Sequence, residues 1–292
     1  MIIPGYNGDM NSPRYSEWLP LRTALISSYR GRPDQLNFRY LPPGMTAWLV
    51  CRGRAEVVHG KIATAANAGQ WLIPRPISRL QRFSDDIELL SVNFFAHWPT
   101  GEPLFDLSEA LVLEARDHPQ MEQRAMALDE LIGSLVASHG YGVYMREMPV
   151  ESYLRVQQVF MGFFRVLIEA LASVGLTPAP PGSTDARLSL ALNLIERHPY
   201  NQPISLPQLA QAAGLSVVHL NRLAVQHLGK TLRQFCDRRR GEYARRCLLL
   251  PGIQIKQVAL NLGFSTAGHF SRWFSKQYGL SPRQFQSQPR LV

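Results

Sequence analysis

A short unit is written twice near the C-terminus of this chain, and no other feature of the sequence restricts the fold as much. HLNRLAVQHLGKTLRQF runs from His219 to Phe235, and HFSRWFSKQYGLSPRQF runs from His269 to Phe285. The two stretches agree at six positions with a constant step of fifty residues: a histidine, an arginine, a glycine and a final Arg-Gln-Phe triplet. One structural unit is therefore expected in two copies.

Each copy has the layout of a helix-turn-helix. In the first, SLPQLAQAA predicts a helix with its apolar residues on one face, Gly214 supplies the turn, and Ser216 is a good N-cap for a second helix. In the second, IKQVALNL precedes Gly263, and either Ser265 or Thr266 caps the following helix. The residues expected to face the core are Leu220 and Leu223 in the first copy and Phe270 and Phe274 in the second.

A single helix from about Thr231 to Leu250 is expected to join the two units. At 1.5 Å per residue it would be about 30 Å long, close to the 34 Å repeat of duplex DNA. Both second helices could then enter adjacent turns of one major groove. The run DRRRGEYARR lies in this helix, and some of its arginines are expected to contact phosphates while others are solvated or hold the two units together.

The positive charge of the chain lies in this C-terminal part. The net charge is +9, and residues from 185 onward carry fifteen Lys and Arg against four Asp and Glu, whereas residues 1–184 carry sixteen against eighteen. A nearly neutral front joined to a basic back indicates that the back binds a polyanion, and nucleic acid is the leading candidate. A basic membrane-surface segment would instead concentrate its charge on one amphipathic helix.

The front of the chain follows a different pattern. From about Leu36 to Phe95, short apolar or alternating runs separated by Gly, Pro, Asn and Asp predict several antiparallel strands in a sandwich or small barrel. From about Asp106, apolar residues three and four apart predict two helices, and the second is apolar around much of its girth. That helix is expected to pack against the strand domain and against a second subunit. GLTPAPPGSTDAR, from Gly175 to Arg187, has the composition of a linker.

The sequence contains no segment typical of membrane insertion or secretion. No stretch reaches the roughly 20 consecutive apolar residues of a membrane-spanning helix, and the first residues lack the regions of a signal peptide, so a cytoplasmic protein is expected. The three cysteines include no CxxC pair, which argues against a disulfide framework or a zinc finger and favours buried thiols.

Residues from about Leu188 to Phe285 resemble the AraC/XylS family of bacterial transcription regulators. LAQAAGLSVVHLNRLAVQHLGKTLRQF is followed by RRRGEYARRCLLL and IKQVALNLGFSTAGHFSRWFSKQYGLSPRQF, with the GF, HFSR, YG and SP elements spaced as in that family. The resemblance implies two helix-turn-helix subdomains bridged by one long helix. It also implies contacts to base edges from Val218, Asn221 and Arg222 of the first recognition helix and from Ala267, Gly268, His269 and Arg272 of the second.

The chemistry of several of these side chains suits a major groove. Arginine can bond to the guanine edge, asparagine to the adenine edge, and a valine methyl can pack on the thymine methyl. The alternative for each residue considered by itself is that it is an ordinary solvent-exposed residue beside the core. Weaker contacts, to the DNA backbone, are expected from Ser216, Thr231, Ser265 and Arg239.

Three departures from the family pattern concern packing and readout. Ala224 stands where the family has a core phenylalanine, so the first unit is expected to pack differently. Gly241 replaces an apolar residue in the bridging helix, at a cost of about 1 kcal/mol. Ala267 and Gly268 offer almost no hydrogen bonding. We therefore expect the first copy to supply more of the direct readout and the second more of the anchoring.

The front domain is similar, more loosely, to the cupin-like sensing barrel of that family, through GMTAWLVCRGRAEVV and AGQWLIPRP. This implies an α+β fold with an N-terminal cupin-like β-barrel and a helical dimerisation segment. His59 is the only histidine between Leu36 and Phe95, which argues against a metal centre or a cupin oxygenase. An effector pocket in this domain is expected to be lined by Arg39, Trp48, Trp71 and Arg79. An arginine there could hold a carboxylate or phosphate. The alternative is that the tryptophans are core residues and the arginines surface residues.

These patterns divide the chain into a cupin-like sensing domain at 1–103, a helical segment for dimerisation at 104–175, a linker at 176–186 and a DNA-binding domain at 187–288. The expected protein is a regulator that binds double-stranded DNA, responds to a small-molecule effector, forms a homodimer and contacts RNA polymerase. Two alternatives are a cupin-type enzyme with a basic appendage, for which no catalytic cluster or phosphate loop is visible, and a non-specific architectural DNA binder. No cofactor is expected, and the sequence names neither the effector, the operator nor the sign of regulation.

Overall fold

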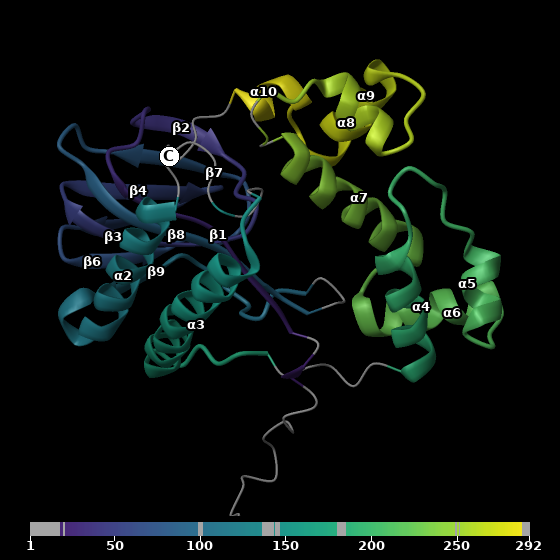
Figure 1. Ribbon diagram of the computed structural model, residues 1–292, viewed down its shortest axis with the longest axis horizontal. Coiled ribbons are helices and arrows are strands. Elements are labelled where there is room, and N and C mark those ends of the chain that lie inside the picture. The colour runs from purple at the N-terminus through teal and green to yellow at the C-terminus, as the bar shows by residue number, and fades with distance from the viewer. Residues whose placement is uncertain are drawn as a thin grey trace, which may run out of the picture.

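The computed structural model describes residues 18–19, 21–98, 102–135, 143, 147–179, 185–248, 250 and 252–287. Strands occupy the first part of the chain and helices the last part, as Figure 1 shows. Two helices lie against the strands, and the C-terminal helices form a separate group. The expected combination of a sheet domain and a helical domain is confirmed.

The strands of the described residues form two antiparallel sheets. The first has the order β1-β8-β3-β6-β9, and the second has the order β2-β7-β4-β5. The first sheet consists of β1 (Arg22–Gly31), β8 (Glu88–His97), β3 (Met45–Arg52), β6 (Gln70–Ile73) and β9 (Leu111–Glu114). The second consists of β2 (Asn37–Tyr40), β7 (Arg79–Phe83), β4 (Arg54–His59) and β5 (Ile62–Asn67).

The two sheets face each other and do not close into one barrel. Trp48 and Leu89 of the first sheet share one buried cluster with Phe38 and Val57 of the second. The hydrogen-bonded pairing of the described strands stays within each sheet. The expected β-barrel is therefore an open sandwich in the described part of the chain, because side chains rather than ladder hydrogen bonds join the sheets.

The strand region is longer than the sequence pattern indicated. β1 begins before the predicted strand segment, and β9 lies inside the stretch 104–175 that was expected to be helical. β9 pairs with β6, with Leu113 opposite Trp71, and forms an edge of the first sheet. The helical prediction is wrong at this strand, because four residues are too few to show a period and a distant partner decides their conformation.

Two helices cover the outer face of the first sheet. The short 3₁₀ turn η1 (Ala115–Asp117) leads into α2 (Pro119–Leu135), and α3 (Val150–Ser173) follows. Phe94 of β8 packs against Phe160 and Phe164 of α3, with ring centroids 6.0 and 5.8 Å apart. By length and composition, α3 is the one described helix that could cross a membrane; here its phenylalanines are buried in the core of the sheet domain.

The helical domain consists of two units joined by one helix. α7 (Leu232–Leu248) runs from the α4–α6 group to the α8–α10 group (Figure 1). Its 17 residues span about 25 Å, slightly less than the expected helix. Residues 180–184 of the expected linker lie outside the described residues. The other helices are α4 (Ala186–Arg197), α5 (Leu206–Ala212), α6 (Val217–Leu228), α8 (Ile255–Asn261), α9 (Ala267–Tyr278) and α10 (Pro282–Gln286).

The cores of the two units differ in kind. Ala224 is completely buried in the first unit, where Phe235 is the one aromatic residue among the fully buried members of the cluster. The core of the second unit contains four buried phenylalanines, among them Phe270 and Phe274. The first unit therefore packs aliphatic side chains where the second packs rings, in agreement with the departure expected at Ala224.

Gly241 lies where the end of α9 comes close to the bridging helix. A side chain at this position would overlap the hydroxyl group of Tyr278. The guanidinium carbon of Arg245 lies 5.5 Å from the centre of the same tyrosine ring. Glycine thus costs helix propensity in α7 and in return allows Tyr278 to pack directly on the helix backbone.

Candidate nucleic-acid interface

Matching caps begin the second helix of each unit. The Ser216 Oγ accepts a hydrogen bond from the His219 N–H at 3.2 Å, and the Thr266 Oγ1 accepts one from the His269 N–H at 3.1 Å. These hydroxyl groups satisfy backbone donors that have no partner inside the helix. Of the two candidates in the second unit, Thr266 is the cap, and Ser265 lies exposed before it.

The shared glycine ends both recognition helices. Gly229 follows α6 with a φ of 64°, and Gly279 follows α9 with a φ of 74°. Both values lie in the left-handed region, which side chains disfavour and glycine adopts readily. The repeated glycine is therefore explained by helix termination.

The Arg-Gln-Phe triplet closes each unit through its last two residues. Gln234 Oε1 accepts a hydrogen bond from the Thr231 N–H at 2.8 Å, and Gln284 Oε1 accepts one from the Ser281 N–H at the same distance. In both copies the hydroxyl group of the N-cap accepts a bond from the glutamine N–H in return, which completes a capping box. Phe235 is buried, and so is Phe285.

The first residue of the triplet has no such structural use. Arg233 and Arg283 are exposed in the first turn of their helices, each beside a capping box. A cation in this position is disfavoured by the helix dipole. These two arginines are not among the residues predicted to contact DNA, although their recurrence at a step of fifty residues is a signal that identifies them.

On the first recognition helix, α6, two of the three expected base-reading residues are exposed. Val218 is 80% exposed, and Arg222 is exposed as well. Asn221 is half-buried, and its Oδ1 accepts a hydrogen bond from the backbone N–H of Leu232 at 3.1 Å. Its carboxamide oxygen is therefore engaged with α7, whereas bidentate recognition of adenine uses both the oxygen and the nitrogen.

On the second recognition helix, α9, Gly268, His269 and Arg272 are exposed and Ala267 is half-buried. The His269 ring lies edge-on to Phe264, with centroids 5.4 Å apart. The imidazole is thus supported on one side by the aromatic core while its helix face remains accessible. These four positions lie fifty residues after Val217, Val218, His219 and Arg222 of α6.

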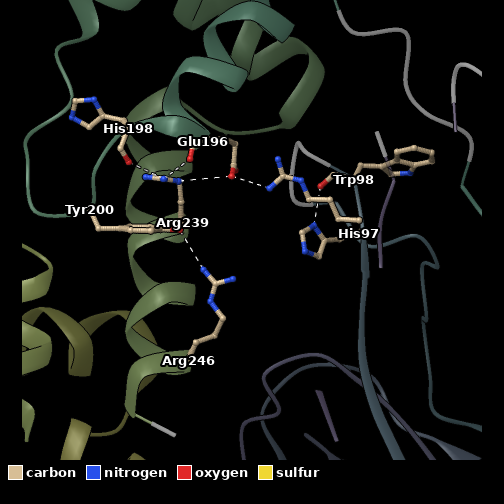
Figure 2. A network of polar contacts seen from close by, with 8 residues as sticks. His97, Trp98, Glu196, His198, Tyr200, Arg239 and Arg246 are labelled. Atoms are coloured by element: carbon tan, nitrogen blue, oxygen red, sulfur yellow. Dashed lines mark hydrogen bonds and ion pairs between the residues drawn. The ribbon is translucent and has the colours of Figure 1, made fainter. Parts of the chain in front are cut away.

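Arg239 is part of the fold, which corrects the expected phosphate contact. Its Nη2 donates to the carbonyl oxygens of Glu196 and His198 at 2.7 and 2.9 Å, as Figure 2 shows. The guanidinium carbon lies 4.0 Å from the centre of the Tyr200 ring, and the residue is only 7% exposed. A guanidinium buried in this way cannot reach a DNA phosphate, because the side chain ties α7 to α4.

Other arginines of the bridging helix are also engaged in the protein. Arg240 Nη2 donates to the Leu262 carbonyl at 2.5 Å, its guanidinium lies over the Phe264 ring, and burial lowers its pKa. Arg245 Nη2 donates to the carbonyl oxygen of Pro42 in the sheet domain. The exposed cations among the described residues of the two units lie elsewhere: Arg187, Arg197, Arg222, Arg233, Lys256, Arg272, Lys276 and Arg283.

The four residues expected to line an effector pocket do not form one site: Arg79 lies over the Trp48 ring between the two sheets, but Trp71 and Arg39 lie elsewhere. Trp48 is buried between the two sheets, whereas Trp71 lies on the opposite face of the first sheet, 6.3 Å from the Phe163 ring of α3. The strands place them there because neighbouring residues alternate between faces: Trp48 is paired with Leu72 and Trp71 with Leu49. Arg39 is exposed on β2.

Arg79 is completely buried between the sheets. Its guanidinium lies over the rings of Trp48 and Tyr40, at 5.3 and 5.6 Å, and donates to Thr46 Oγ1 at 3.3 Å. Burial lowers the pKa of Arg79 to about 9. None of the ion pairs between described residues includes it.

Metal-binding clusters are absent from the described residues. No group of three or more His, Cys, Asp or Glu side chains there could hold a metal ion. His59 is buried, which lowers its pKa. Cys247 is buried as expected, whereas Cys51 and Cys236 are half-buried thiols.

A protein-family model matches this chain in its helical domain. Residues 209–288 match the family model described as a helix-turn-helix domain. The transcriptional activator RhaS of Escherichia fergusonii is 32% identical over 104 residues, covering 36% of this chain and 37% of RhaS. The transcriptional regulator ArgR of Pseudomonas aeruginosa is 30% identical over 109 residues, covering 37% of this chain and 33% of ArgR. The chain thus spans little more than a third of these relatives.

A solved structure matches along nearly the whole length. ToxT from Vibrio cholerae O395 has a TM-score of 0.50 and 14% identity to this chain, and the match covers 94% of this chain and 99% of ToxT. At this identity the likeness concerns the fold alone.

Proposed function

We propose that this chain, whose helix-turn-helix domain resembles that of the AraC/XylS family of transcription regulators, regulates transcription by sequence-specific binding to double-stranded DNA. The observation that carries the proposal is the pair of recognition helices, α6 and α9. They are capped and ended in the same way and joined by a single helix of 17 residues. Such a pair can present two equivalent helices to successive turns of one groove.

The base contacts proposed for α6 come from Val218 and Arg222. Val218 is almost fully exposed, which suits packing on a thymine methyl, and the exposed Arg222 suits the guanine edge. Asn221 takes part through its amide nitrogen, because its oxygen is bonded to Leu232. Ser216 and Thr231 remain candidate backbone contacts, although each hydroxyl group already accepts a capping bond.

The contacts proposed for α9 come from His269 and Arg272, with Ala267 and Gly268 allowing close approach to the groove. Ser265 is exposed just before this helix and can donate to a phosphate. The repeated arginines Arg233 and Arg283 are added as phosphate contacts, since an exposed cation beside a helix N-terminus is favoured once a phosphate lies there.

The sheet domain is proposed to be a cupin-like sensing domain that controls the helical domain by direct contact. Leu41, which follows β2, is buried in the core cluster of the second helix-turn-helix unit. Arg22 Nη1 of β1 bonds to Glu196 Oε2 of α4 at 2.8 Å, and Arg245 bonds to Pro42. Both units of the DNA-binding domain, at about 187–288, are therefore touched by the sheet domain, and an effector acting there would reach both.

A homodimer through the helices of the sheet domain is also part of the proposal. α3 buries one face against the sheet, yet Val150, Leu154 and Met161 are 61%, 59% and 45% exposed. Apolar side chains exposed along one long helix suit a second copy of the chain. Contact with RNA polymerase and a cytoplasmic location follow from the proposed role in transcription; the relatives are regulators, not enzymes, and no enzymatic activity is proposed.

The test is a binding selection from random double-stranded fragments with the full chain, followed by dissociation constants for the selected site and for random duplex at one salt concentration. We expect the selected site to bind at least about a thousandfold more tightly. Equal affinity for both would identify an architectural DNA binder. Failure to bind any duplex would refute the proposed function.

A further inference from the structure

A cavity of about 410 Å³ lies between the sheet domain and the helical domain. Its sheet-domain wall includes Arg22, Pro42 and Phe95, and its other wall is formed by α7 with Glu196 and Tyr200. Figure 2 shows part of this region, where Arg239 of α7 lies near Glu196 and Tyr200, and Arg246 of the same helix lies near Tyr200. The volume is within the range of cavities that hold small molecules, about 300 to 1,000 Å³.

The lining of this cavity is strongly cationic. It contains five arginines, Arg22 and four from α7, against the two carboxylates Glu196 and Glu242. Both carboxylates are already bonded: Glu196 to Arg22 at 2.8 Å, and Glu242 to Arg238 at 3.0 Å. The net charge of the lining is therefore positive, and most of it lies on the wall formed by α7.

One of these arginines also carries a buried donor without an acceptor. The Nε atom of Arg245 is buried and has no hydrogen-bond partner among the described residues, whereas the Nε atom of Arg239 lies 3.9 Å from the Glu196 carboxylate. A buried donor of this kind is normally satisfied by an acceptor of the protein or of a ligand, so its place on a cationic cavity favours a ligand with negative charge.

We propose that this cavity binds a small organic anion with two or three acidic groups, carboxylates or phosphates, and that this anion is the effector of the proposed regulator. The acidic groups lie on the arginines of α7, and the body of the molecule lies against the prolines and Phe95 of the other wall. The regulatory role of the anion rests on the proposed function, whereas its binding to the cavity does not. Because α7 joins the two helix-turn-helix units, a ligand bridging both walls fixes the bridging helix to the sheet domain.

Isothermal titration calorimetry on the full chain tests this binding with three probes: citrate, glucose 6-phosphate and, as the neutral control, glucose. We expect saturable binding of one molecule per chain for at least one anion at submillimolar concentration, and none for glucose. Preference for citrate or for glucose 6-phosphate distinguishes a carboxylate from a phosphate effector. The absence of saturable binding by either anion would overturn the proposal.

A matched pair of variants locates the site. Arg22 and Arg82 each lie on a strand and each bond to one half-buried glutamate, at 2.8 and 3.1 Å, but only Arg22 lines the cavity. Arg22→Gln is expected to weaken anion binding about tenfold and Arg82→Gln to leave it unchanged. Arg245→Gln, on the opposite wall, is expected to weaken it as well. Equal effects of Arg22→Gln and Arg82→Gln would show non-specific binding and contradict the inference.

DNA binding measured on the same preparations separates the two proposals. Specific DNA binding without anion binding would leave the proposed function standing and remove this inference. Anion binding without any DNA binding would do the reverse. If both hold, saturating anion is expected to change the affinity for the selected site by at least about fivefold, which corresponds to a typical coupling between sites.

Discussion

Asn221 and Leu232 join the first recognition helix to the bridging helix: the Asn221 Oδ1 accepts a hydrogen bond from the Leu232 N–H at 3.1 Å. Leu232 is the first residue of α7, where backbone donors have no partner within the helix. A residue expected from its position to read DNA therefore also holds the start of the bridging helix. This bond helps to set the angle between α6 and α7, and therefore the angle at which α6 would enter a DNA groove.

Replacement of Asn221 separates these two roles. Asn221→Ala is expected to lower the free energy of unfolding by about 1 kcal/mol, because the Leu232 N–H loses its acceptor. Asn221→Asp keeps an acceptor and should retain most of the stability, while its charge weakens DNA binding. Urea unfolding and DNA titration of both variants provide the measurement. Unchanged stability of Asn221→Ala would mean that the contact to Leu232 contributes nothing.

Arg222 is expected to distinguish one DNA sequence from another. Arg222→Ala should weaken binding to the selected site by about 1 to 3 kcal/mol and binding to random duplex much less. Arg197→Ala is the control, since Arg197 is also an exposed arginine, at the end of α4 and outside both recognition helices. The measurement is the dissociation constant of each variant for the selected site and for random duplex at one salt concentration. An equal loss on both DNAs would assign Arg222 to a phosphate.

Gly241 offers a test of close packing, with Gly133 as its control. Both glycines lie inside helices, but added atoms would meet Tyr278 at position 241 and nothing within 4 Å at position 133. Gly133→Ala is expected to stabilise the protein by about 0.5 to 1 kcal/mol through helix propensity. Gly241→Ala is expected to destabilise it by about 1 to 3 kcal/mol through overpacking. Thermal unfolding of the two variants should show opposite signs; stabilisation by both would contradict the close approach.

Arg79 is expected to make the stability of the protein depend on pH in the alkaline range. Burial lowers its pKa in the folded state to about 9 from 12.5, so between these values the unfolded chain holds a proton that the folded chain has released. Stability therefore rises with pH across that window and is lower by a constant amount below it. Relative to Arg79→Met, the wild-type protein should gain roughly 1 kcal/mol per pH unit above 9. Urea unfolding from pH 8 to 10.5 measures this, and a difference that stays flat would show that Arg79 keeps its charge.

The helix-turn-helix units could be predicted almost completely from the sequence. Ser216, Gly214 and Leu220 act through local rules for caps, turns and apolar spacing, and the structure confirms each of them. The strand β9 could not be predicted, because its conformation depends on pairing with β6, forty residues earlier along the chain. A local pattern identifies an element that is long enough to show a hydrophobic period, and a four-residue edge strand is too short to show one.

The candidate site shows the same division at the level of side chains. Arg239 and Arg240 belong to a basic run that looks exposed in the sequence, yet the structure buries Arg239 against Tyr200 and places Arg240 over Phe264. Trp48 and Trp71 seemed to belong to one pocket, but the alternation of strand residues places them on opposite faces. Helix period and strand alternation place a side chain on a face, but not opposite a particular partner.

The sequence by itself determined the presence of two helix-turn-helix units, their order, their caps and the sign of their charge, because these depend on residues close together in the chain. Only the tertiary structure decided which arginines remain exposed, that Gly241 makes room for Tyr278, and that the sheet domain touches α7 through Leu41, Pro42 and Arg22. Contacts of this second kind join residues up to about two hundred positions apart, as Pro42 and Arg245 are. They depend on the shapes of two packed surfaces, which no local pattern records.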